Sequence, residues 1–160
     1  MLHQIDHVNI VVKDLEASVA FYRDVLGLRE TMRARLEGDW IEQVTGVAGV
    51  VAECVYLELA TGTRLELLAF EQPANGAPDP LAGHPPHPGM RHIAFRVEDI
   101  HAVYTDLKAR GVEFVGPPVA VPTAIHRHHS GRKWLCYFHG PEGVLLEICE
   151  FIAAPDAESK

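Results

Sequence analysis

The chain carries two histidine–glutamate pairs at repeated positions, and these four side chains are the ones best suited to chemistry. His7 opens the segment HVNIVVKDL, and His92 opens HIAFRVEDI 85 residues later (92 − 7). A glutamate follows each histidine inside an apolar run, Glu66 after 59 residues (66 − 7) and Glu147 after 55 (147 − 92). Two imidazoles and two carboxylates form a ligand set for one divalent transition metal, namely Ni, Co, Zn, Mn or Fe.

The alternation of side chains along the strands predicts that all four candidates lie on the sheet faces that are not packed against the helices. Alternate residues of a strand point to opposite faces, so Glu66 points away from the face on which Leu65 and Leu67 are buried. The same alternation applies around the other three candidates. A single glutamate in an apolar strand more often marks an edge or a solvated face. Four residues of matching parity at repeat-related positions instead favour a metal site on faces that the helices leave uncovered.

The elements that position the first pair are predicted to follow the order βαβββ. A strand is expected over residues 5–12, and a helix begins after its N-cap Asp14 and stops at Gly27. Further strands are expected over residues 28–36, 52–60 and 63–70. The last two are joined by a tight turn at Thr61-Gly62, and a short helix is predicted within residues 38–49.

The second module repeats this plan. A strand is predicted over 90–97, a helix over 99–110 and a strand from Val112, followed by a loop over 116–131 and strands over 133–139 and 144–151. Six prolines between Glu71 and Gly89 predict a linker, in which His84 and His87 are expected to be exposed loop residues. The predicted organisation is one domain over 1–153, made of modules 1–70 and 90–153 joined by linker 71–89, with a polar tail over 154–160.

Composition excludes several classes of function. The formal net charge of −8 argues against a nucleic-acid partner, and the single basic patch, 127–133 with its neighbouring histidines, is expected to be a solvated loop or a guide for a small anion. No apolar run is long enough to span a membrane, and the N-terminus lacks the pattern of a signal peptide, so a cytoplasmic location is expected. The three cysteines form no C-x-x-C pair and are predicted to be small buried hydrophobes.

The chain resembles the vicinal oxygen chelate superfamily, which includes glyoxalase I, methylmalonyl-CoA epimerase, extradiol dioxygenases and bleomycin resistance proteins. The resemblance covers nearly the whole chain. Glu66 favours the glyoxalase I branch, because the epimerase typically has a glutamine as its second ligand. The segments that carry the resemblance are Asp6-His7-Val8, Phe21 to Leu28, Leu65-Glu66-Leu67, Arg91 to Phe95, and Gly140-Pro141-Glu142-Gly143 through Glu147.

This resemblance implies an α+β fold in which two βαβββ modules form a cupped, eight-stranded mixed sheet around one divalent metal. It implies that His7, Glu66, His92 and Glu147 bind the metal and that two coordination positions stay open for a small-molecule substrate. Members of this kind abstract a proton next to a carbonyl, and the residue that matches their base is Glu147. The resemblance also implies a homodimer, and no organic cofactor is expected.

Three functions stay open at this point. The first is a metal-dependent lyase, isomerase or epimerase of the glyoxalase I type. The second is an extradiol-type dioxygenase, which would hold Fe(II) with two histidines and one carboxylate, although Glu66 would then occupy a position that this chemistry needs open. The third is a binding protein that sequesters an antibiotic or another small molecule without chemistry.

Overall fold

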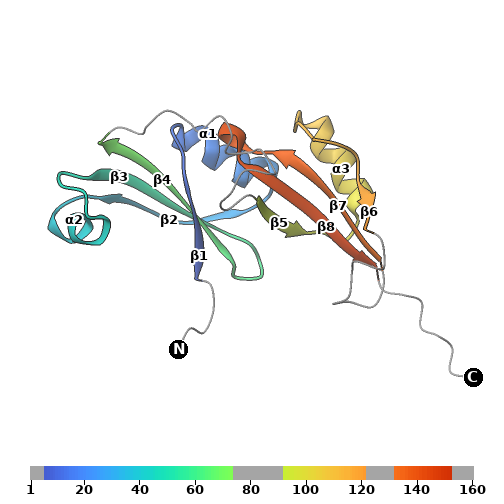
Figure 1. Ribbon diagram of the computed structural model, residues 1–160, viewed down its shortest axis with the longest axis horizontal. Coiled ribbons are helices and arrows are strands. Elements are labelled where there is room, and N and C mark those ends of the chain that lie inside the picture. Colours follow the sequence, from blue (N-terminus) through green and yellow to red (C-terminus); the bar gives the residue numbers. More distant parts are fainter. Residues whose placement is uncertain (1–5, 74–91, 122–131, 153–160) are drawn as a thin grey trace, which may run out of the picture. The chain divides into compact units, whose positions relative to one another are not determined.

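Each half of the chain forms a four-stranded mixed sheet with the same strand order (Figure 1). The computed structural model describes residues 6–73, 92–121 and 132–152. The chain divides into two units, residues 1–78 and 79–160. The first sheet has the order β1-β4-β3-β2 and the second has the order β5-β8-β7-β6. This confirms the predicted α+β fold of two βαβββ modules, each of which contributes four strands.

The first unit follows the predicted order, including the short helix between its second and third strands. Its parallel pair is β1 with β4, and the other neighbours are antiparallel. The predicted helix divides into α1 and a π-helical turn over Phe21–Val25, and the helix expected within residues 38–49 is present as α2. The elements are β1 (His7–Val11), α1 (Leu15–Ala20), β2 (Arg29–Leu36), α2 (Asp39–Thr45), β3 (Val51–Glu58) and β4 (Arg64–Gln72).

The second unit repeats this arrangement, and its parallel pair is β5 with β8. The last two strands, β7 and β8, are antiparallel and are joined through a 3-10 turn over Pro141–Gly143, where turn residues were predicted. The elements are β5 (His92–Arg96), α3 (Ile100–Ala109), β6 (Val119–Ala120), β7 (Arg132–His139) and β8 (Leu145–Ile152).

Helices α1 and α3 begin at the aspartates that the sequence marks as caps. The Asp14 side chain accepts a hydrogen bond from the backbone N–H of Ala17 at 2.9 Å, and Asp99 does the same for Ala102 at 2.9 Å. A capped first turn satisfies backbone donors that would otherwise lack partners. The repeated aspartates therefore start α1 and α3 at equivalent points directly after the first strand of each unit.

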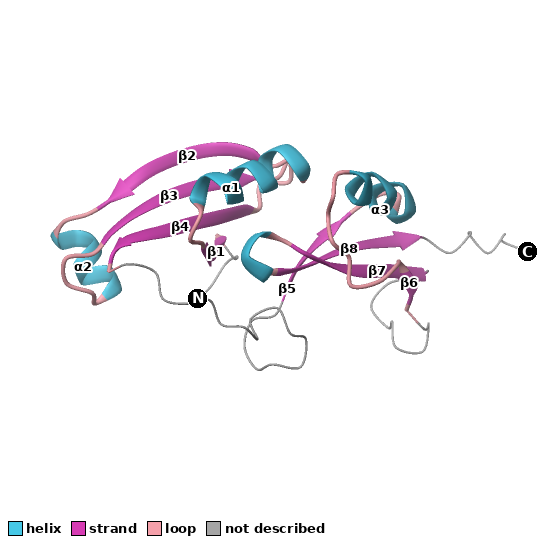
Figure 2. Ribbon diagram, turned by 90° about the horizontal axis from the view of Figure 1, so that it is seen from above, coloured by secondary structure: helices cyan, strands magenta, loops and turns pink. Residues whose placement is uncertain are grey.

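Helices α1 and α3 each cover one face of their own sheet (Figure 2). In the first unit α1 packs on β3 and β4, where Val19, Leu57 and Leu67 are fully buried. In the second unit α3 packs on β8, where Ile100 and Leu146 are fully buried. Burial of such side chains is the main stabilising contribution, about 1.5–3 kcal/mol for each large aliphatic residue. The opposite side of each sheet, which we call the open face, is not covered by these helices.

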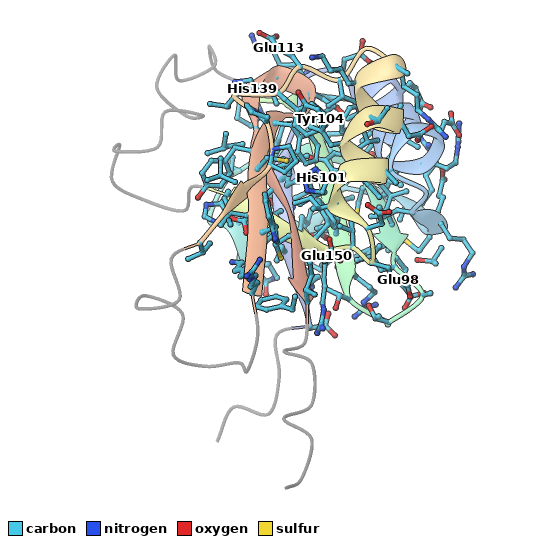
Figure 3. The ribbon with its side chains drawn as sticks, turned by 90° about the vertical axis from the view of Figure 1, so that its right-hand side faces the viewer. Glu98, His101, Tyr104, Glu113, His139 and Glu150 are labelled. Carbon is cyan, nitrogen blue, oxygen red and sulfur yellow. The ribbon has the colours of Figure 1, made fainter. Side chains whose placement is uncertain are left out.

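Polar residues on the helix side of the second sheet have structural partners. Figure 3 shows His101 and Tyr104 on the side of α3 turned toward the sheet. The His101 ring packs edge-on against Trp134, with centroids 5.0 Å apart. Glu150 accepts a hydrogen bond from the backbone N–H of Ile100 at 3.0 Å and so supplies a second cap to α3. These contacts account for the histidine and the glutamate on this side of the unit.

The strand predicted from Val112 is wrong in its extent. Phe114 forms an isolated bridge with Phe138, and pairing resumes only in β6, inside the segment predicted to be a loop. Gly116-Pro117-Pro118 separates the two pieces. Proline has no N–H to donate to a strand ladder, so the strand is interrupted at this point and continues beyond it.

Several predicted features lie outside the described residues. These are most of the proline-rich linker with His84 and His87, most of the basic patch with its histidines, and the tail. The three cysteines are described, and all are free and buried as predicted. Among the described residues, no helix combines the length and the apolar character needed to cross a membrane.

Candidate metal and proton-transfer site

The first unit brings His7 and Glu66 together on its open face. The residues come from β1 and β4, which are parallel neighbours in which Asn9 lies opposite Glu66. His7 is two residues before Asn9, so its side chain projects from the same face. The Nε2 atom of His7 lies 3.3 Å from Oε2 of Glu66. The strand register therefore joins two side chains that are far apart in sequence.

The second unit brings His92 and Glu147 together in the same way. Here Ala94 of β5 lies opposite Glu147 of β8, and His92 again precedes that position by two residues. The Nε2 atom of His92 lies 3.2 Å from Oε2 of Glu147. The repeat therefore reproduces a histidine–carboxylate pair with matching geometry and matching strand register. The sequence predicted this common parity, and the structure adds the direct contact.

A tyrosine lies beside each pair, and neither tyrosine is among the four site residues predicted from the sequence. Tyr56 lies opposite Glu66 in the β3–β4 pairing, and Tyr137 lies opposite Glu147 in the β7–β8 pairing. Tyr56 packs edge-on against the ring of His7 at 5.5 Å, and Tyr137 lies 5.1 Å from the ring of His92. The missed signal is a constant spacing, since each tyrosine precedes its glutamate by ten residues (66 − 56 and 147 − 137).

Burial and a nearby carboxylate keep both phenols protonated at neutral pH. Desolvation, together with hydrogen bonding to Glu66, raises the pKa of Tyr56 to about 12. Desolvation and the charge of Glu147 raise the pKa of Tyr137. A protonated phenol is a hydrogen-bond donor, so each pair has a neutral donor beside its carboxylate.

Neutral donors hold the carboxylate of Glu66 at both oxygens. Asn9 Nδ2 donates to Oε2 at 3.0 Å, and Cys54 Sγ donates to Oε1 at 3.3 Å. Desolvation and the nearby Glu66 carboxylate raise the pKa of the Cys54 thiol to about 12, so the sulfur stays protonated as a donor. Cys54 is therefore a hydrogen-bond donor to Glu66 as well as a buried apolar residue. These hydrogen bonds fix the orientation of Glu66.

The carboxylate of Glu147 has a different environment. The residue is only 3% exposed, and the Nζ atom of Lys133 lies 3.3 Å from its Oε1 atom. Oε1 nevertheless makes no hydrogen bond of good geometry within the described part of the chain. An ammonium group compensates the buried charge without locking the oxygen in place. From the sequence alone, Lys133 belongs to a basic patch at the start of a predicted strand and has no assigned role in the site.

The donor chemistry of each pair fits a cation. A neutral imidazole has one nitrogen with a lone pair, and a carboxylate offers only lone pairs. When Nε2 carries that lone pair, the nitrogen and the carboxylate oxygen are two hydrogen-bond acceptors 3.2–3.3 Å apart, and they repel each other. A proton or a metal ion between them removes this repulsion. Within the described segments, no three His, Cys, Asp or Glu side chains converge on one point. Each unit by itself thus offers two donors.

Comparisons with known proteins show similarity over most of the chain. The profile of the Glyoxalase/Bleomycin resistance protein/Dioxygenase superfamily matches residues 4–148. The chain is 30% identical over 162 residues to 2-epi-5-epi-valiolone epimerase from an Actinomyces species, with 98% of this chain and 84% of that protein covered. It is 34% identical over 119 residues to ethylmalonyl-CoA/methylmalonyl-CoA epimerase from Cereibacter sphaeroides, with 72% and 77% covered.

Solved structures show the same fold. The crystal structure of a glyoxalase family protein from Bacillus cereus matches with a TM-score of 0.80 at 31% sequence identity, and the match covers 96% of this chain and 97% of that one. A glyoxalase family protein from Enterococcus faecalis matches with a TM-score of 0.65 at 25% identity, covering 92% and 97%.

Proposed function

The chain belongs to the Glyoxalase/Bleomycin resistance protein/Dioxygenase superfamily, and we propose that it is a metal-dependent isomerase or lyase. Its reaction would move a proton at a carbon next to a carbonyl group of a small substrate. The observation that carries the proposal is the pair of histidine–carboxylate contacts, 3.3 Å and 3.2 Å long, at equivalent places in the two units. The relatives named as epimerases support this class of reaction.

The residues that would hold the metal are His7, Glu66, His92 and Glu147. Two neutral imidazoles and two carboxylates balance the charge of a dication, and nitrogen and oxygen ligands suit Ni, Co, Zn, Mn or Fe. Such a set takes one pair from each unit. A bound divalent cation would supply Lewis acidity, which makes the hydrogen next to a chelated carbonyl more acidic.

The two carboxylates would have different roles, because their surroundings differ. Glu66 is held at both oxygens by Asn9 and Cys54, so it is suited to be a fixed ligand. Within the described residues, Glu147 has no such hydrogen bond at Oε1 and instead faces the ammonium group of Lys133. We therefore assign proton abstraction and return to the Glu147 carboxylate. Lys133 would compensate its charge whenever the carboxylate is ionised.

The burial of Glu147 supports this role. A carboxylate that is 3% exposed has lost most of its contact with water, and a base shielded from water transfers a proton to the substrate rather than to solvent. Positioned general bases accelerate reactions by about 10² to 10⁴-fold. A small substrate reaching the open face would meet Glu147 beside the ring of His92 and the phenol of Tyr137.

The proposal is tested by solvent exchange in the metal-loaded protein. Substrates to try are methylmalonyl-CoA, ethylmalonyl-CoA, 2-epi-5-epi-valiolone and the hemithioacetal of methylglyoxal with glutathione. Proton NMR in D₂O should show deuterium entering, or a proton being transferred at, the carbon next to the carbonyl. Metal-loaded protein that leaves all of them unchanged, and instead consumes oxygen with a catechol, would replace the proposal with a dioxygenase. Tight binding of a ligand without turnover would replace it with a binding protein.

A further inference from the structure

Asp6 contacts the ring nitrogen of His7 that points away from Glu66. Its Oδ2 atom lies 2.9 Å from Nδ1 of His7. Both carboxylate oxygens of Asp6 also accept hydrogen bonds from a guanidinium nitrogen of Arg64. Asp6 is exposed, and an exposed aspartate is ionised at neutral pH because the ordinary pKa of its carboxyl is about 3.9. The order of contacts is therefore Arg64, Asp6, His7, Glu66.

This order of contacts determines where the proton of a neutral His7 ring must be. An ionised carboxylate only accepts hydrogen bonds, so Nδ1 has to carry the hydrogen that Asp6 accepts. The other nitrogen, Nε2, then keeps its lone pair, and this is the atom that lies 3.3 Å from Glu66. A lone pair directed at the shared space beside Glu66 is what a metal ligand requires.

We propose that Asp6 is a positioning residue that fixes the ring orientation and the tautomer of His7, so that Nε2 is ready to bind the metal. The inference rests on the proposed metal site and makes it more specific. Arg64 holds Asp6 in place at both oxygens. The second module has no equivalent carboxylate in its sequence, because the residue before His92 is Arg91. The contact with a preceding aspartate therefore distinguishes His7 from His92.

If Asp6 had only a structural role, its removal would lower the unfolding temperature, and any loss of metal affinity would follow from that. The side chains of Asp6 and Arg64 are 59% and 36% exposed, and ion pairs at such exposed positions contribute little to stability. A carboxylate that orients a metal-binding histidine typically affects metal affinity by about 10 to 100-fold. Removal of Asp6 should therefore weaken metal binding strongly while thermal unfolding of the metal-free protein changes little.

The experiment compares the full-length wild type with Asp6→Ala, Asp6→Asn and Asp24→Asn. Asparagine keeps an oxygen that can accept from Nδ1 and should largely rescue the site. Asp24 is the matched control, because it is an exposed aspartate of the same unit whose two-point contact, at 2.7 and 2.8 Å, is with the adjacent Arg23. The probes are Zn²⁺ and Co²⁺ alone, measured by competition with a chromophoric chelator. Nitrogen-15 NMR of the histidine rings reports the tautomer in the metal-free protein.

We expect the wild type, Asp6→Asn and Asp24→Asn to show His7 with its hydrogen on Nδ1. Asp6→Ala should lose this preference and bind both metals about 10 to 100-fold more weakly, at an unchanged unfolding temperature without metal. Unchanged tautomer and affinity in Asp6→Ala would overturn the inference, and so would an affinity loss that only follows a fall in unfolding temperature. A wild type that binds neither metal would instead overturn the proposed function, and the tautomer measurement would still decide the role of Asp6.

Discussion

Replacement of Glu147 by glutamine is the perturbation that tests the proton-transfer role most directly. Glutamine has almost the same shape but cannot accept a proton at neutral pH. If Glu147 is the base, the loss should be about 10² to 10⁴-fold in rate, which corresponds to about 3–5 kcal/mol of barrier. The contacts of the side chain, 3.2 Å to His92 and 3.3 Å to Lys133, leave room for the isosteric amide.

The stability of this variant can be estimated from the same contacts. Loss of the negative charge leaves Lys133 without its ion-pair partner. A fully buried pair broken in this way costs about 3–5 kcal/mol. The Lys133 side chain is 22% exposed and can recover part of its hydration, so we expect a smaller loss of about 1–3 kcal/mol. The variant should therefore fold, and thermal unfolding will verify this before any rate is compared.

The assay follows deuterium incorporation next to the substrate carbonyl by NMR at saturating metal. Two matched variants separate loss of the base from loss of the metal and from a general effect of substitution in β8. Glu66→Gln should weaken metal binding but keep much of the rate once the site is saturated, since this residue is assigned as a fixed ligand. Glu150→Gln changes a glutamate of the same strand that lies on the helix side, where it caps α3 (Figure 3), and should leave the rate unchanged. Full activity in Glu147→Gln, or identical losses in Glu147→Gln and Glu66→Gln, would refute the assignment.

Three further predictions follow from the described contacts and from the sequence. His92→Ala should lose the bound metal together with the thermal stabilisation that the metal provides, measured by elemental analysis and by unfolding with and without a chelator, and unchanged metal content would exclude the site. Burial raises the pKa of Cys54 from 9.0 to about 12 and that of Cys136 from 9.0 to about 11. The folded state therefore holds more protons than the unfolded state above pH 9, and stability should fall as pH rises from 9 toward 12. Cys54→Ala should show a shallower fall in unfolding temperature over this range, and an equal slope would contradict the assignment. Finally, the protein should be a homodimer by light scattering at micromolar concentration, and a monomer there would disprove this; activity recovered on mixing His7→Ala with His92→Ala subunits would indicate shared sites.

The local part of this structure was predictable from the sequence because it depends on short-range chemistry. Alternation of apolar residues predicts the strands and their buried faces, and the aspartates before α1 and α3 predict where the helices begin. The repeat of His7 and His92 with their glutamates predicted the four candidate residues and their common parity. The strand after Val112 was the exception. Two consecutive prolines interrupt this strand, and whether it pairs again beyond them depends on the neighbouring strand, which lies elsewhere in the sequence.

What only the tertiary structure decided is which side chains touch. Parity assigns a residue to a face, but the register between strands decides its neighbours, and that register comes from backbone hydrogen bonds between segments distant in sequence. The placement of β1 beside β4 brings His7 to Glu66. The β7–β8 pairing sets Tyr137 opposite Glu147 and Lys133 opposite Phe151, from where the long Lys133 side chain reaches Glu147. The different surroundings of the two carboxylates, and with them the different roles proposed here, arise from these long-range pairings rather than from the repeated sequence, in which the two glutamates are alike.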